Sequence, residues 1–216
     1  MSVSVSVVLF LLAAGAAAVD WWSVGSGRQR VETVAKPLTM AALVGVAAVA
    51  GSAPGDVRSW LVLGAAFGLV GDVALLDDRE AAFMIGLGAF AVGHLAYAVA
   101  ALLTGFSPAA GLLGAAFTAA LLAYRFVPET LPGAREHGGG MLGGAVVFYA
   151  IVISFMVVTA WGTTRWAVAV GASLFAISDW VLGYQRFVGP LPGGRVSVHV
   201  PYHVGQALLI LGLVSV

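Results

Sequence analysis

The sequence contains no cysteine and few charged residues. None of its 216 residues is cysteine and only 9% are charged. The absence of cysteine excludes a disulfide framework, an iron–sulfur cluster, a thiolate zinc site and a cysteine nucleophile. Because ten basic residues match ten acidic ones, no excess positive charge is available to bind a nucleic acid. Any catalysis must therefore use oxygen and nitrogen groups, and we expect neither a nucleic-acid partner nor a bound cofactor.

Long apolar runs make up most of the chain. Hydrophobic residues account for 61% of it and the mean hydropathy is +1.01. A helix needs about 20 apolar residues to cross a bilayer core. Runs of suitable length occupy residues 3–19, 34–51, 60–76, 81–103, 109–127, 141–161, 166–184 and 200–216. They predict an all-α polytopic membrane bundle of eight transmembrane helices, with residues 128–140 as a loop and with 1–216 as a single domain.

The first run has a second interpretation. Ala16-Ala17-Ala18 resembles the cleavage site of a signal peptide, but no positive charge precedes the run. We therefore expect it to be retained as a helix.

The basic residues are distributed unevenly between the two sides of this predicted bundle. If successive helices alternate in direction, one side carries eight of them: Arg28, Arg30, Lys36, Arg79, Arg125, Arg135, Arg186 and Arg195. The other side carries Arg58 and Arg165. Basic residues concentrate on the cytoplasmic side of a membrane. We therefore expect both termini outside, in a plasma membrane of bacterial type.

Tryptophan and glycine are expected to have structural roles. Amphipathic indole rings prefer the headgroup layer, and five tryptophans lie at predicted helix ends: Trp21, Trp22, Trp60, Trp161 and Trp166. Glycines spaced four apart allow helix backbones to approach closely. The pairs Gly64–Gly68 and Gly140–Gly144 therefore predict close helix packing.

Few ionisable side chains lie within the apolar runs. Each costs at least about 2.5 kcal/mol near the bilayer centre, so each is a candidate for function. They are Lys36, Asp72, His94, Asp179 and His203. Because adjacent helices run in opposite directions, all but His94 are expected in the inner-leaflet third. This shared depth predicts one site.

Asp72 and Asp179 are the acidic members of this set. Two carboxylates in one low-dielectric cavity repel each other, so that one keeps its proton and the pair supplies an acid and a base. The alternative for Asp72 is a structural ion pair with Lys36. The alternative for His94 is a buried, hydrogen-bonded side chain. Ser178 points about 100° away from Asp179 around a helix, which does not favour a nucleophile there.

Two histidines have a spacing that suits a shared metal ion. His199 and His203 lie four residues apart, on one face of a helix. Pro201 between them favours a helix start at that point instead.

Four short motifs occur in order along the second to eighth runs. They are Lys36-Pro37-Leu38-Thr39-Met40, Gly71-Asp72-Val73-Ala74-Leu75-Leu76, the series Phe83, Gly86, Phe90, Gly93, His94 and Tyr97, and Phe175-Ala176-Ile177-Ser178-Asp179. In this order and spacing they resemble the YhhN-like lysoplasmalogenase family. The resemblance implies an integral membrane hydrolase that cleaves the vinyl ether bond of a lysoplasmalogen and releases a fatty aldehyde and a glycerophospho-alcohol.

The resemblance also implies roles for the candidate residues. A vinyl ether is hydrolysed by acid, because protonation of its β-carbon gives an oxygen-stabilised cation that water attacks. One of Asp72 and Asp179 would be the general acid, and the other would stabilise the cation and orient the water. The expected partners are the lipid bilayer and a single-chain lipid substrate. Residues expected to bind it or to tune the carboxylates are Lys36, His94, Tyr97, Ser178 and His203.

Two other functions use the same residues. A zinc-dependent lipid amide or ester hydrolase would place His94, His199, His203 and an aspartate around one metal ion. A proton-coupled lipid transporter would use Asp72 and Asp179 as proton carriers. The absence of a convincing internal repeat in the sequence disfavours the transporter.

The predicted orientation is tested by cysteine labelling on intact cells. With both termini outside, cysteines introduced at Ser2 and Ser215 react with an impermeant thiol reagent, because the chain has no other thiol. Labelling that requires cell lysis would contradict this topology.

Overall fold

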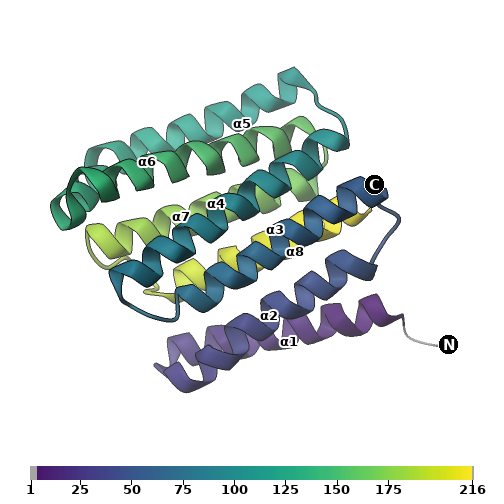
Figure 1. Cartoon of the computed structure of the whole chain (residues 1–216), viewed down its shortest axis with the longest axis horizontal. Helices are drawn as coiled ribbons and strands as arrows, with labels where there is room; N and C mark the ends of the chain where they lie inside the picture. Colours follow the sequence, from purple (N-terminus) through teal and green to yellow (C-terminus); the bar gives the residue numbers. More distant parts are fainter. Residues whose placement is uncertain (1–3, 216) are drawn as a thin grey trace.

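The computed structural model describes residues 4–215, all helices and connections (Figure 1). Ser2, one of the two labelling positions, lies outside the described residues. The helices are α1 Val5–Gly25, α2 Gln29–Val49, α3 Gly55–Ala74, α4 Glu80–Leu103, α5 Pro108–Leu121, the π-helix η1 Leu122–Thr130, α6 Leu131–Gly162, α7 Trp166–Phe187 and α8 Val196–Val214. The predicted all-α membrane bundle is confirmed.

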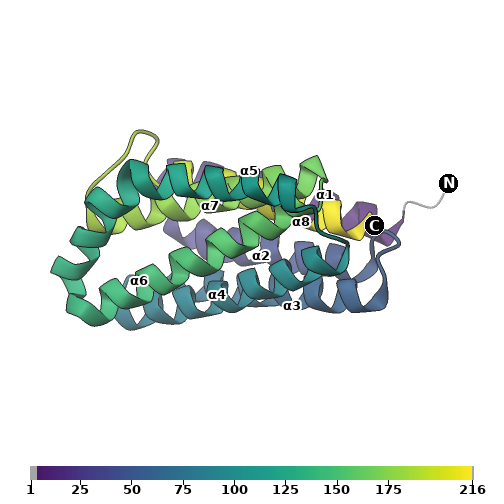
Figure 2. The same cartoon turned by 90° about the horizontal axis from the view of Figure 1, so that it is seen from above.

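Seven stretches of residues 4–215 are long and apolar enough to cross a membrane, so this is a multi-pass membrane protein. Six are single helices, and the seventh is the continuous 55-residue run Pro108–Gly162, which contains α5, η1 and α6. This run turns back on itself, so that α5 and the later part of α6 lie antiparallel (Figure 2). Gly138 and Gly139 have non-helical backbone angles and form the bend. Eight separate passes and the orientation in the membrane stay predictions.

The expected loop at residues 128–140 is wrong, because nearly all of it is helical. Polar side chains at the start of this segment form hydrogen bonds with one another and with α7. Arg125 Nη1 lies 2.8 Å from Glu129 Oε1, and Tyr184 from α7 donates to Glu129 Oε2 at 2.9 Å. The first helix also extends beyond the expected end at Val19 to Gly25, which places Asp20 inside it.

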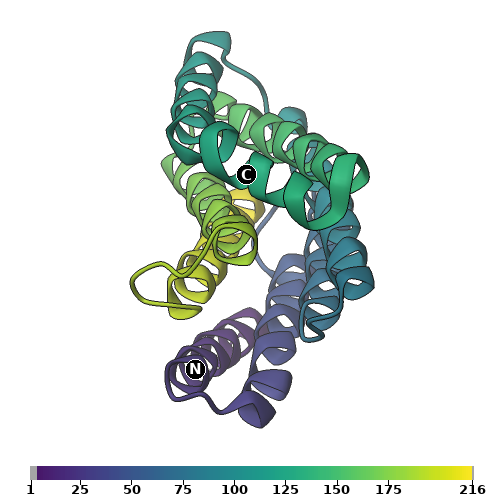
Figure 3. The ribbon, with the colours of Figure 1, turned by 90° about the vertical axis from the view of Figure 1, so that its left-hand side faces the viewer.

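The helices lie in antiparallel pairs (Figure 3). The pair α1–α2 lies at one side, α5–α6 at the other, and α3–α4 and α7–α8 lie between them. The connections 26–28, 75–79 and 188–195 lie at one end of the bundle, and α1 begins and α8 ends at the other (Figure 1). Most basic residues therefore lie toward the first end.

Glycine gives close packing at one predicted pair and not at the other. A Cβ at Gly64 would lie 2.6 Å from the Tyr97 ring, and one at Gly68 would lie 3.0 Å from Gln206 Nε2. These distances confirm the packing prediction for Gly64 and Gly68. It is wrong for Gly140 and Gly144, where a Cβ would meet nothing within 4 Å.

Two of the five tryptophans are not simple headgroup anchors. Trp21 Nε1 donates to His203 Nδ1 at 3.1 Å, and Trp161 Nε1 donates to Ser173 Oγ at 3.0 Å. Their indole N–H groups find buried acceptors, so these rings join helices within the bundle. The other three are exposed, as an anchor requires: Trp22, Trp60 and Trp166.

Replacement of Gly171 by alanine tests the contact between α7 and α8. The new Cβ would lie 2.7 Å from Leu209 N and 2.8 Å from Gly205 O, both backbone atoms that cannot rotate away. We expect Gly171→Ala to destabilise the bundle by about 1–3 kcal/mol, as other overpacking does, and to lower the unfolding midpoint in detergent. Gly144→Ala is the matched control, with a neutral or slightly raised midpoint because alanine favours helix. Equal midpoints would contradict this packing.

Candidate active site

A polar cavity lies between the helices at the end where connections 75–79 and 188–195 meet. Its wall includes Lys36, Asp72, Asp179, His199 and Tyr202, from α2, α3, α7 and α8. The two candidate carboxylates thus face one cavity although they lie 107 positions apart in the sequence. Charges buried in a low-dielectric interior interact strongly, so the arrangement suits acid–base chemistry.

Asp72 has two partners, each from a different helix. Lys36 Nζ lies 3.3 Å from Asp72 Oδ1, and Tyr202 donates from its hydroxyl to Asp72 Oδ2 at 2.8 Å. Asp72 is fully buried and Lys36 is 6% exposed. The expected ion pair is therefore present at the cavity wall, and it connects α2, α3 and α8.

Asp179 has a separate set of partners. Its Oδ2 accepts a hydrogen bond from the Tyr149 hydroxyl and lies 3.3 Å from His94 Nε2. His94 Nε2 is also 2.8 Å from the Tyr149 oxygen, and His94 is buried. The histidine thus forms a buried hydrogen-bonded contact beside Asp179 and lines no part of the polar cavity.

A second cavity, lined mainly by apolar side chains, adjoins the polar one. The two share Leu75, Phe83, Phe90, Leu182 and Asp179. Of the described residues, Asp179 alone is an acidic side chain on both walls. Asp179 therefore marks the boundary between apolar and polar space.

Three other predicted residues have structural contacts. Ser178 Oγ donates to the Val198 carbonyl at 2.8 Å, which joins α7 to α8 at the polar cavity. Tyr97 donates to Gln206 Oε1 at 2.6 Å, and His203 accepts from Trp21. Tyr97 and His203 line neither cavity, so they are not placed to touch a substrate there.

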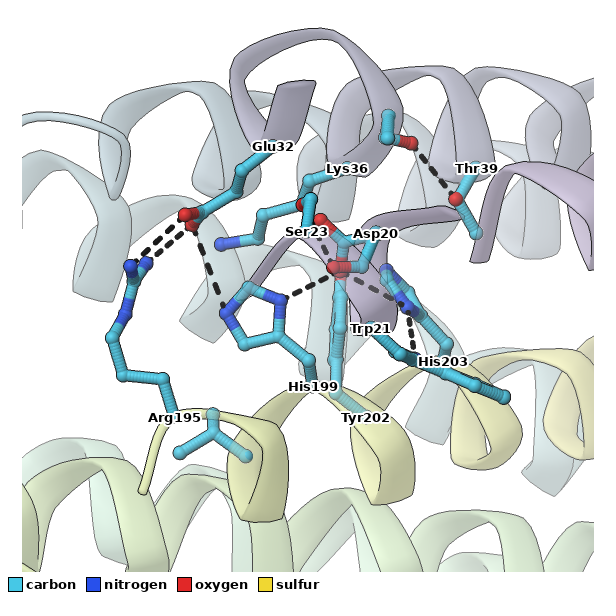
Figure 4. A network of polar contacts seen from close by, with 12 residues as sticks. Asp20, Trp21, Ser23, Glu32, Lys36, Thr39, Arg195, His199, Tyr202 and His203 are labelled. Carbon is cyan, nitrogen blue, oxygen red and sulfur yellow. Dashed lines mark hydrogen bonds and ion pairs between the residues drawn. The ribbon is translucent and has the colours of Figure 1, made fainter. Parts of the chain in front are cut away.

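A network of polar residues, most of them buried, lies between α1, α2 and α8 beside the polar cavity (Figure 4). His199 Nδ1 is 2.7 Å from Asp20 Oδ2, and Arg195 Nη1 donates to Glu32 Oε2 at 2.9 Å. The sequence did not single out Asp20 and Glu32, because the predicted runs ended at residue 19 and began at 34. Both are buried inside longer helices.

The aromatic hydroxyls were also missed. Tyr149 and Tyr202 lie within apolar runs, where a polar group needs a partner, so that signal was present in the sequence. Periodicity did not reveal their partners, which come from other helices.

The histidines do not gather around one point. Among residues 4–215, no group of three or more His, Asp or Glu side chains is placed to hold a metal ion. His94 lies with Asp179, whereas His199 and His203 lie near Asp20. The expected helix start at Pro201 is wrong, because α8 begins at Val196.

Charged residues in the connections and at the ends of helices complete the cavity. Arg79 Nε donates to Asp77 Oδ2 at 2.7 Å, and this hydrogen bond lowers the pKa of the Asp77 carboxyl below its ordinary value. Asp77, Asp78, Arg186 and Arg195 all lie on the polar cavity wall. This part of the cavity thus presents both signs of charge.

Comparison with known proteins identifies the family. The model of the YhhN family matches residues 31–213. The chain belongs to the YhhN family. It is 36% identical over 162 residues to lysoplasmalogenase TMEM86B of Mus musculus, covering 74% of this chain and 66% of that protein. It is 29% identical over 165 residues to lysoplasmalogenase TMEM86A of Bos taurus, covering 72% of this chain and 65% of that protein.

The YhhN-family chain covers just under two thirds of the length of these curated relatives. No solved structure matches it significantly.

Lys36 is expected to stabilise this YhhN-family chain through Asp72. Lys36→Met leaves a buried carboxylate without its cation, which destabilises a protein by about 3–5 kcal/mol. We expect a lower unfolding midpoint in detergent, largely restored in the double variant Lys36→Met/Asp72→Asn because no unpaired charge remains. Arg79→Ala, which breaks the exposed pair with Asp77, is the control and should leave the midpoint unchanged. A double variant no more stable than Lys36→Met would contradict this coupling.

Proposed function

We propose that the chain is a membrane-embedded hydrolase that cleaves the vinyl ether bond of a lysoplasmalogen, in a plasma membrane of bacterial type. The observation that carries this proposal is the position of Asp179 on the walls of both cavities. In such a lipid the vinyl ether lies where the hydrocarbon chain meets the polar glycerol. A chain in the apolar cavity and a headgroup in the polar cavity would therefore bring this bond to Asp179.

The reaction requires a proton donor at the β-carbon of the vinyl ether. We assign this role to Asp179, because it is the carboxyl that the apolar cavity reaches. Proton transfer leaves an oxygen-stabilised cation, and the Asp72 carboxylate on the facing part of the cavity would stabilise that positive charge. Water then adds to the cation, and the resulting hemiacetal separates into a fatty aldehyde and a glycerophospho-alcohol.

The polar cavity has the charges for a zwitterionic headgroup. Arg186 and Arg195 would bind the phosphate, since guanidinium groups suit planar recognition of phosphate oxygens. Asp77 and Asp78 would face an amine beyond it. The names of the relatives, lysoplasmalogenases in Mus musculus and Bos taurus, support the same class of substrate.

Substitution of the two aspartates by asparagine tests the mechanism on purified protein. Asp179→Asn and Asp72→Asn keep the shape of the side chain and remove the titrating oxygen. Each should lower kcat for aldehyde release by at least roughly 10²-fold, as loss of a positioned acid or base does. The double variant should be little slower than the slower single variant, because the two groups act as one unit.

The control is Asp56→Asn, at the opposite end of the helix that carries Asp72; its activity should equal that of the parent. Chelators should also leave the activity unchanged. A folded protein that releases no aldehyde, but hydrolyses an ester or amide and stops on metal removal, would contradict the carboxylate mechanism in favour of a metal hydrolase. Proton-linked lipid transport without hydrolysis would favour a transporter.

A further inference from the structure

We infer that His199, oriented by Asp20, is the base that takes a proton from the attacking water. This inference rests on the proposed function and adds a catalytic residue and a positioning residue to it. His199 lines the polar cavity that also contains Asp72 and Asp179. It is therefore in the same space as the cation that the water must attack.

The hydrogen bond to Asp20 determines which nitrogen of His199 is available. The Nδ1 atom lies 2.7 Å from Asp20 Oδ2, and Asp20 is fully buried. A carboxylate accepts hydrogen bonds, so Nδ1 carries the proton and Nε2 of the neutral ring has the free lone pair. Among residues 4–215 no hydrogen bond to Nε2 occurs, and Glu32 Oε1 is 4.0 Å away. A histidine held in this way is arranged as a general base.

Of the two histidines near Asp20, His199 is the one that donates a hydrogen bond to it. His203 Nδ1 is 3.8 Å from Asp20 Oδ2, but it accepts the Trp21 N–H and so has no proton to donate. The other charged groups near His199 are Glu32 and Lys36 from α2, Asp72 from α3 and Arg195, the residue that precedes α8. Glu32 is paired with Arg195, and Lys36 with Asp72.

Asp20 lies on α1, outside residues 31–213 that match the family model. The positioning residue therefore comes from a helix that the family match does not include.

The added base completes the proton balance of the reaction. Asp179 donates its proton to the β-carbon, and the C=C π electrons form the new C–H bond. Water forms a C–O bond to the adjacent carbon and transfers a proton to His199 Nε2. The hemiacetal hydroxyl then returns a proton to Asp179 while the bond to the glycerol oxygen breaks and His199 protonates that oxygen. One water is consumed, and both residues return to their starting states.

Deuterium exchange during turnover tests this assignment. The probe is a lysoplasmalogen with an ethanolamine headgroup, incubated with purified protein in detergent and D₂O, and the unreacted lipid is recovered and analysed by mass spectrometry. In the parent protein, water captures the cation quickly, so the recovered lipid contains no deuterium at the vinyl β-carbon. In His199→Gln, capture is slow, so the cation rotates about its new Cα–Cβ single bond and loses its original β-hydrogen to Asp179, which leaves the deuteron on the β-carbon. We expect kcat lower by at least roughly 10²-fold and deuterium in the recovered lipid.

Further variants make the result specific. Asp20→Asn keeps the size of the side chain and should give the same deuterium signature with kcat lower by at least roughly 10-fold. His137→Gln is the matched control, because His137 is exposed and lines neither cavity; it should behave as the parent does. Asp179→Asn should give neither aldehyde nor deuterium.

The other possible outcomes contradict either the role of His199 or the proposed function. Normal turnover in His199→Gln, or slow turnover without deuterium in the recovered lipid, overturns the role of His199 and leaves the proposed function standing. An inactive but folded parent protein overturns the proposed function and this inference together. If His199→Gln does not fold, Asp20→Asn decides the question by the same readout.

Discussion

Burying a charge in the membrane is tolerated where that charge has a partner, and the pair Lys36–Asp72 meets this condition in the bundle. The two side chains come from α2 and α3, and the Tyr202 hydroxyl on α8 provides the other bond to the carboxylate. These three helices must therefore meet at this depth. Their meeting places Asp72 on a cavity wall instead of at a lipid surface, and the site depends on it.

The same requirement is satisfied differently at Asp179. Its partners are the Tyr149 hydroxyl and the His94 imidazole, which contact its Oδ2. One carboxylate of the cavity is thus paired with a lysine, and the other with a tyrosine hydroxyl and a histidine imidazole. This asymmetry suits a division of roles, in which one group stabilises positive charge and the other transfers a proton.

The fold also separates apolar from polar space. Close contacts such as those at Gly64 and Gly171 bring helices together away from the site, where backbones approach without side chains between them. The apolar cavity meets the polar one around Phe83 and Phe90, which line both. An amphipathic single-chain lipid matches this junction in chemistry and in orientation.

The sequence by itself determined the membrane bundle and the principal carboxylates, because apolar length and a lone charge within it are local properties that the bilayer constrains strongly. It also indicated that Asp72 and Asp179 share a depth, since alternating helices fix depth from position in the chain. Only the tertiary structure decided which groups touch, such as Tyr149 with Asp179 and Asp20 with His199. Those contacts depend on the rotation of each helix about its axis and on its neighbours, and packing between distant segments sets both.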